Sequence, residues 1–233
     1  MIDIGASDFY NTIKELGEEI TFLDHDGGTE LSVQHAAIAP NRRNQAIGTT
    51  DGACWYAGNI TFDSIEQQQI LTGSYFRRTT KPQILMMLYS IFPENSTEHI
   101  GTVNCVECND KVDIISHYEK TGEVNEFGEP IFAPVYIHRD VDCFFTVYTK
   151  EAKNAPVGAF VETVTYVTMP AKYTVSVKNT IMRKGFFFNE TTKQNEYGMK
   201  PYKVESVDTS MTNEINGELC GTVRYLITES PEK

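Results

Sequence analysis

Short stretches in which apolar and polar residues alternate dominate this chain, and a period of two residues predicts β-strands. The expected strands cover residues 19–23, 31–38, 53–57, 59–62, 100–107, 112–118, 130–137, 141–149, 159–169, 175–182, 202–207 and 222–228, with 68–72 as a weaker candidate. Periodicity does not decide between helix and strand for the apolar run at 83–92. Glycine-containing turns, such as Asn216-Gly217, separate neighbouring strands. Many short strands joined by turns are typical of small barrels or sandwiches.

One segment near the N-terminus follows a helical period instead. Ser7 can cap its first turn, and Phe9, Ile13 and Leu16 recur at helical spacing. Gly17 supplies a stop signal at the C-terminal end. The sequence therefore predicts a helix over residues 7–16.

The second half of the chain repeats the strand order of the first half. The Gly-Thr-Val strand at 100–108 is matched by the one at 220–228. In the same order, 19–22 matches 113–116, 58–63 matches 158–163, and 89–92 matches 202–205. A chance alignment of short β patterns is the alternative. The repeat predicts a mainly β protein of two tandem small β-barrel or sandwich domains with a short N-terminal helix. We expect residues 1–112 to hold the helix and a first barrel-like domain, and 113–233 a second β-barrel domain.

The formal charge of −12 is divided between the halves as −8 over residues 1–112 and −4 over the remainder. Such a field repels phosphate, so we do not expect the bulk surface to bind nucleic acid; it suits a basic partner or serves solubility alone. No apolar run approaches the roughly 18 residues of a membrane span, and no secretory signal is evident. Five cysteines without a framework-like spacing predict reduced thiols in a protein assembled in a cytoplasm.

The residues that could carry chemistry form no recognised catalytic pattern. Cys105 and Cys108 make a single Cys-x-x-Cys, which supplies two of the four ligands of a zinc site and lies in a predicted strand. The five histidines share no spacing, and neither a phosphate-binding loop nor a nucleophile elbow is present. We expect no catalytic residue, cofactor or metal. The open alternative is a soluble enzyme or ligand-binding β-barrel that uses these cysteines or a histidine.

The run Phe186-Phe187-Phe188 stands out between Lys184 and Asn189. It predicts a strand buried in the core, and the alternative is an exposed apolar patch that needs a partner.

Residues 113–229 resemble the small β-barrel head-closure or head–tail adaptor proteins of tailed bacteriophages. The resemblance rests on a strand that enters a Thr121-Gly122 turn, the Phe127-Gly128-Glu129 step and the strand at 141–145. It continues through a polar loop at 151–157 and the strands at 161–169. The Gly-Asp turn of that family is missing from this chain. The first half of the chain resembles a diverged copy of the same domain.

The resemblance implies a non-enzymatic virion protein, assembled in the host cytoplasm, that forms a homo-oligomeric ring in the phage neck. Its partners would be the portal or adaptor and the tail, and genome DNA would pass through the lumen without specific binding. A tail terminator, tail-tube or baseplate protein is the alternative within this class. Contacts are expected in the polar loops at 40–52, 93–99, 119–130, 150–157 and 189–201. The candidate interface residues are Arg42, Arg43, Arg77, Arg78, Glu151, Lys153, Asn154, Asn189 and Lys193.

Overall fold

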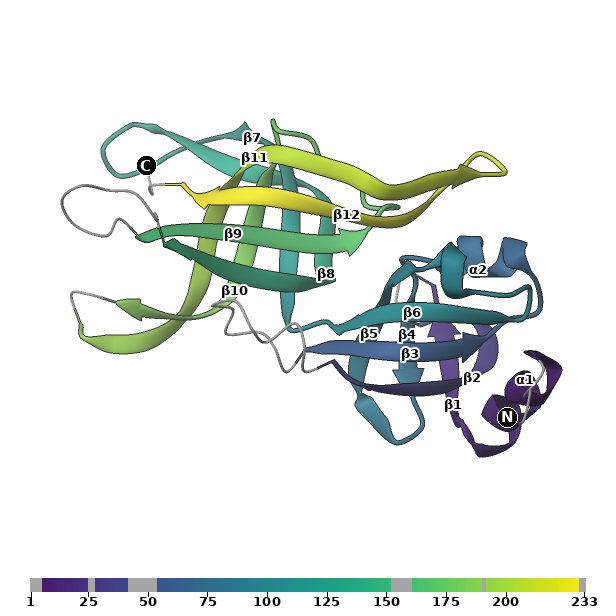
Figure 1. The fold of residues 1–233 in the computed structure, drawn as a ribbon. Helices are drawn as coiled ribbons and strands as arrows, with labels where there is room; N and C mark the ends of the chain where they lie inside the picture. The colour runs from purple at the N-terminus through teal and green to yellow at the C-terminus, as the bar shows by residue number, and fades with distance from the viewer. Residues whose placement is uncertain (1–5, 25–27, 42–53, 152–160, 190–191, 231–233) are drawn as a thin grey trace.

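The computed structural model describes residues 6–24, 28–41, 54–151, 161–189 and 192–230, and within them the chain is mainly β (Figure 1). Helix α1 (Ala6–Leu16) lies outside the first barrel and buries Ile13, while its last turn ends where the Gly17 amide donates to the Ile13 carbonyl (2.8 Å). The predicted N-terminal helix is therefore present.

Six antiparallel strands form the first closed barrel, in the spatial order β1-β2-β3-β6-β5-β4. They are β1 (Glu18–Leu23), β2 (Glu30–Pro40), β3 (Trp55–Thr61), β4 (Tyr75–Arg78), β5 (Lys81–Ile91) and β6 (Ile100–Glu107). Closure leaves no unpaired sheet edge around the barrel wall, so the alternating apolar side chains can fill the interior. Phe22, Phe62 and Phe76 meet there and are fully buried.

Six further antiparallel strands form a second closed barrel, in the order β10-β11-β12-β9-β8-β7. They are β7 (Asp110–Val124), β8 (Pro130–Glu151), β9 (Val161–Pro170), β10 (Thr180–Asn189), β11 (Gln194–Ile215) and β12 (Glu218–Glu229). β7 begins three residues before the domain boundary expected after residue 112. Several of these strands are much longer than those of the first barrel, and the extra length projects beyond the barrel (Figure 1).

The two barrels have the same connectivity, because the first, second and third strands of each pair in sequence and the third then pairs with the sixth. Each of the four matched pairs of sequence segments falls at least partly on two strands that hold the same position in the order of their barrels. These strand pairs are β1 with β7, β3 with β9, β5 with β11 and β6 with β12. The match of 58–63 with 158–163 had the wrong register. Val103 of β6 pairs with Gly58 of β3, and the corresponding Val223 of β12 pairs with Met169 of β9. Gly58 therefore corresponds to Met169.

The barrels touch through a shared apolar layer. The core of the second barrel extends to Leu23, Tyr75, Met87 and Val106 of the first. The Tyr75 hydroxyl donates to the Asp142 carbonyl. At the other side of the junction the Gly221 amide donates to the Thr72 carbonyl (2.7 Å) and the Thr222 hydroxyl to the Tyr89 carbonyl (3.2 Å). These contacts stabilise one arrangement of the two barrels.

Two sequence predictions in the first half need correction. Residues 68–72, expected as a strand, belong instead to helix α2 (Ile65–Leu71) and its C-cap. Ser64 caps this helix by accepting a hydrogen bond from the Gln67 amide (3.1 Å), and Leu71 is buried. The segments 53–57 and 59–62, expected as two strands, contribute to the single strand β3, and the undecided run at 83–92 lies mostly in β5.

Candidate functional site: two projecting arms

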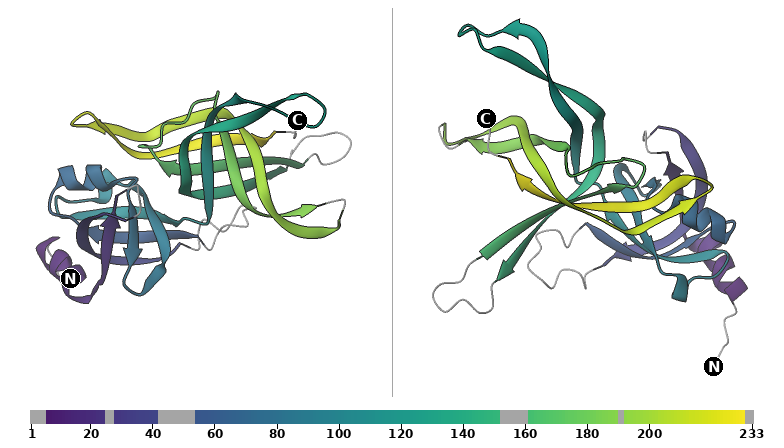
Figure 2. Two further views of the ribbon diagram at one scale, coloured as in Figure 1. Left: turned by 180° about the vertical axis from the view of Figure 1, so that it is seen from behind. Right: turned by 90° about the horizontal axis from the view of Figure 1, so that it is seen from above.

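Two β-hairpins extend from the second barrel, and we call them arm one (residues 116–137 of β7 and β8) and arm two (residues 184–200 of β10 and β11). β7 and β10 pair only from Val112–Arg183 to Ile115–Thr180. Because that ladder is antiparallel, β7 and β10 leave it at opposite ends and carry the two arms apart. Figure 1 shows arm one at the upper left and arm two at the lower left, and Figure 2 shows that they diverge.

The expected loops at 119–130 and 189–201 were therefore wrong over most of their length. β7 continues to Val124 and β8 starts at Pro130, so only the tip of arm one is a turn. In arm two, β10 runs to Asn189 and β11 begins at Gln194. Both segments are polar enough to look like loops, but their backbone groups are paired in a ladder.

A cluster of charges fixes the base of the arms. The Lys184 ammonium binds the Asp113 carboxylate (2.8 Å) and the Asp140 carboxylate (2.7 Å), and Asp113 also accepts the Asp140 amide (2.8 Å). Asp113 is 3% exposed at its side chain, so these partners offset the cost of burying its carboxylate. Asp140 adopts a left-handed conformation (φ 53°) that turns its amide toward Asp113. Beside this cluster, Arg183 pairs with Asp110 and lies over the Phe145 ring (4.0 Å).

The ion pairs perturb the pKa of two of these groups. Burial alone would lower the pKa of Lys184, but its hydrogen bonds to Asp113 and Asp140 outweigh burial and raise it. The hydrogen bond from Lys184 lowers the pKa of Asp140. Both groups are therefore charged at neutral pH. We call the ion-paired cluster of Lys184, Asp113 and Asp140 the brace, because it links β10 to β7 and β8 at the base of the arms.

Arm one is exposed on both faces. Every residue from 117 to 133 except Asn125 is exposed, including the apolar side chains of Tyr118, Val124 and Phe132. A two-stranded ribbon without a covering layer has little stability of its own in water. The arm therefore exposes apolar side chains, and the pairing of its two strands has little stability without a covering partner.

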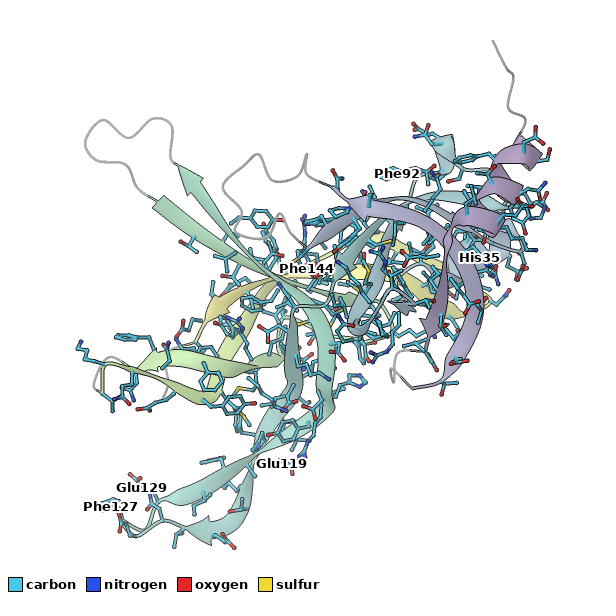
Figure 3. The ribbon with its side chains drawn as sticks, turned by 90° about the horizontal axis from the view of Figure 1, so that it is seen from below. His35, Phe92, Glu119, Phe127, Glu129 and Phe144 are labelled. Carbon is cyan, nitrogen blue, oxygen red and sulfur yellow. The ribbon has the colours of Figure 1, made fainter. Side chains whose placement is uncertain are left out.

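The tip of arm one is a well-defined turn built around Asn125. The Asn125 side-chain oxygen accepts the Phe127 amide (3.0 Å) and the Glu129 amide (2.9 Å), and its amide group donates to the Glu129 carboxylate (3.0 Å). Gly128 adopts a left-handed conformation (φ 79°) that this turn requires. The result is a fixed apex on which Phe127 is 80% exposed (Figure 3).

Arm two carries an exposed aromatic face. The Phe186–Tyr197 pair places two rings side by side in edge contact (centroids 5.4 Å apart), with Phe188 and Met199 on the same face by alternation. Phe186 is 73% exposed and Tyr197 65%. Phe187 points to the opposite face, where the Lys200 ammonium lies over its ring (5.1 Å). The prediction that this phenylalanine run is core was therefore wrong, because β10 has left its partner β7 before Phe186.

The structure brings together few of the predicted interface residues. Arg42, Arg43, Lys153 and Asn154 lie outside the described residues. Glu151 ends β8, Asn189 ends β10 and Lys193 precedes β11, and the Lys193 amide donates to the Asn189 carbonyl (2.8 Å).

The other two predicted residues, Arg77 and Arg78, lie on strand β4 rather than in a loop. The Arg77 guanidinium donates to the Pro82 carbonyl (2.8 Å) and its side chain is exposed. Arg78 pairs with Glu18, and the side chains are 12% and 13% exposed respectively. Arg78 also lies over the Tyr56 ring (5.4 Å), so it is part of the first barrel and is not available as a surface contact.

The described side chains that could act as nucleophiles or metal ligands are dispersed over the structure. Cys105 belongs to the core of the first barrel, whereas Cys108 is half-buried at the junction, and burial raises the pKa of both thiols. Within the described part of the chain no three metal-ligating side chains cluster together. A groove between α2 and the β11–β12 hairpin is lined by residues such as Gln69, Tyr89 and Met211, without a carboxylate, histidine or amine.

Comparisons with protein-family models, with curated proteins and with solved structures gave no match to this chain. Among the described helices none has the length and apolar character needed to span a membrane. The geometry of the arms is thus the feature from which a function can be argued.

Proposed function

We propose that this chain is a structural virion protein of the neck of a tailed bacteriophage, where copies form a ring that joins the portal or adaptor to the tail. The protein has no catalytic role in this proposal. Its work is to supply rigid barrels and to bind neighbours in a fixed geometry.

The observation that carries the proposal is the position of arm one. Two of the sequence steps on which the phage resemblance rests, Thr121-Gly122 and Phe127-Gly128-Glu129, lie on this arm, outside the barrel and exposed. Barrel strands provide a frame, whereas a 22-residue hairpin with both faces exposed has little stability of its own and gains stability when a partner packs against it. An extended, partner-dependent hairpin suits a subunit that must contact several neighbours at once.

Composition and charge support the same proposal. A shared apolar layer joins the two barrels, as a subunit that holds its neighbours in a fixed geometry requires. A chain with a formal charge of −12 repels phosphate, so DNA could pass a ring of such subunits without adhering to it.

Removal of the gene from the phage genome that encodes it tests this function. We expect DNA-filled heads and separate tails, seen by negative-stain microscopy, and loss of infectious particles. The sequence predicts Arg42 and Arg43 as contact residues in a polar segment, so replacement of both with glutamate should give the same separation with a folded subunit. Tails of irregular length would indicate a tail terminator instead, and normal infectious particles would refute a virion role.

A further inference from the structure

We infer that neighbouring copies of this chain bind each other head to tail through their arms, with the Phe127 tip of arm one packed on the aromatic face of arm two of the next copy. This inference names the contact within the proposed ring and to that extent rests on the proposed function. The occupant of each exposed apolar surface is thus a second copy of the same protein.

The two surfaces cannot meet within one chain. β7 and β10 part after four paired positions and their arms leave at opposite ends of that short ladder. Figure 2 shows both arms extending away from the barrel without approaching each other. Phe127 at one tip and Phe186 with Tyr197 on the other arm therefore remain uncovered at 80%, 73% and 65% exposure.

The tip of arm one has the properties of an anchor. Three hydrogen bonds from and to the Asn125 side chain hold the backbone of the turn, so little backbone entropy is lost at the tip when Phe127 packs against a partner. Aromatic side chains held rigidly at the centre of a contact commonly supply most of its binding energy.

Arm two has the properties of the acceptor. Phe186, Phe188, Tyr197 and Met199 form one apolar face of a ribbon, and the charge cluster of Lys184, Asp113 and Asp140 holds the base of that ribbon in place. An aromatic ring inserted among these side chains would make edge or offset contacts of the kind already present between Phe186 and Tyr197.

Charge disfavours arm one against its own copy. Arm one carries four glutamates and one lysine, so two copies of it would bring like charges together. Arm two carries three lysines and two glutamates, and because Lys184 and Lys200 are paired with carboxylates outside the arm it presents no such excess of negative charge to arm one. A contact between two different surfaces is heterologous, and such contacts repeat from copy to copy until a ring closes.

Two variants of the full chain test the inference by complementation. Phe127→Ser removes the anchor, and the double variant Phe186→Ser/Phe188→Ser removes the acceptor face. Sedimentation velocity of the wild-type protein should show assemblies that grow with concentration, and each variant alone should self-associate about thirtyfold more weakly. An equimolar mixture of the two variants should form a one-to-one dimer and no larger species, because one intact anchor then meets one intact acceptor.

Phe92→Ser, at an exposed phenylalanine of the first barrel, is the matched control and should assemble like the wild type. Circular dichroism of each variant shows that it is folded. A wild-type chain that stays monomeric at every accessible concentration would overturn the inference, as would assemblies that both arm variants still form. A mixture that fails to dimerise would also overturn it, because each intact anchor then has an intact acceptor available.

The outcomes separate this inference from the proposed function. If the arm variants assemble normally in solution while gene removal still yields separate heads and tails, the neck function stands and the arm contact fails. If arm-dependent assemblies form but gene removal leaves infectious particles, the contact stands and the neck function fails.

Discussion

Gly73 offers the sharpest test of the junction between the two barrels. It precedes β4, and its amide donates to the Leu88 carbonyl (2.8 Å). A Cβ atom at this position would lie 1.8 Å from the carbonyl oxygen and 2.4 Å from the carbonyl carbon of Gly221 in the second barrel. These are backbone atoms that cannot rotate away, so Gly73→Ala must push the barrels apart.

The expected cost has two parts. Gly73 adopts a left-handed conformation (φ 85°), which costs an alanine about 1–2 kcal/mol. Separation of the barrels also weakens the hydrogen bond from the Gly221 amide to the Thr72 carbonyl (2.7 Å), with a contribution of about 1 kcal/mol. We therefore expect Gly73→Ala to lower the free energy of unfolding by about 2–3 kcal/mol.

Urea denaturation followed by tryptophan fluorescence measures this change. Trp55 is the single tryptophan of the chain, and its ring contacts Phe144 of the second barrel (centroids 5.4 Å apart), so its emission reports on the junction itself. Gly122→Ala and Gly217→Ala are matched controls, because both glycines have nearly the same conformation (φ 85° and 82°) with nothing within 4 Å of the added methyl. Equal destabilisation by all three variants, with unchanged native emission, would refute the proposed junction.

Four further predictions concern the arms and the first core. Lys184→Met leaves the Asp113 carboxylate buried without its ion pair and should lower the free energy of unfolding by about 2–3 kcal/mol. Because the pKa of Asp140 is lowered and that of Lys184 is raised, the brace should be complete at neutral pH. In pH-dependent denaturation the stabilisation should be lost at acid pH, below the usual pKa of an aspartate, as Asp140 is protonated, and at alkaline pH, above the usual pKa of a lysine, as Lys184 is deprotonated. Asn125→Ala should weaken self-association, measured by sedimentation, with little change in melting temperature, since only the tip of arm one loosens. Cys105→Ser should cost about 1–3 kcal/mol in urea denaturation, because the thiol is fully buried, and should leave assembly intact.

Most barrel strands and their duplication were predictable because they follow local rules. Alternation marks each strand with one buried face, and the Gly-Thr-Val step lies near the start of both β6 and β12. Helix α2 was missed although Ser64 and Gln67 have the spacing of a helix start, since four polar residues among its seven conceal its apolar side.

The arms were not predictable because their structure depends on contacts distant in sequence. Residues 119–124 have no apolar face, so nothing local separates a solvated strand from a loop. The exposure of Phe186 depends on where β10 leaves β7, and no property of three consecutive phenylalanines reveals that point. The Asn-x-Phe-Gly sequence of the tip is a turn signal in retrospect, and it was the one local hint at Phe127.

Gold labelling of intact virions tests the central claim most directly. A small affinity tag after Lys233, decorated with gold and viewed by electron microscopy, locates the protein on each particle. A neck protein places the label where head and tail meet, at one position on every particle. Label along the tail tube or at the tail tip, or particles that carry none, would contradict the account.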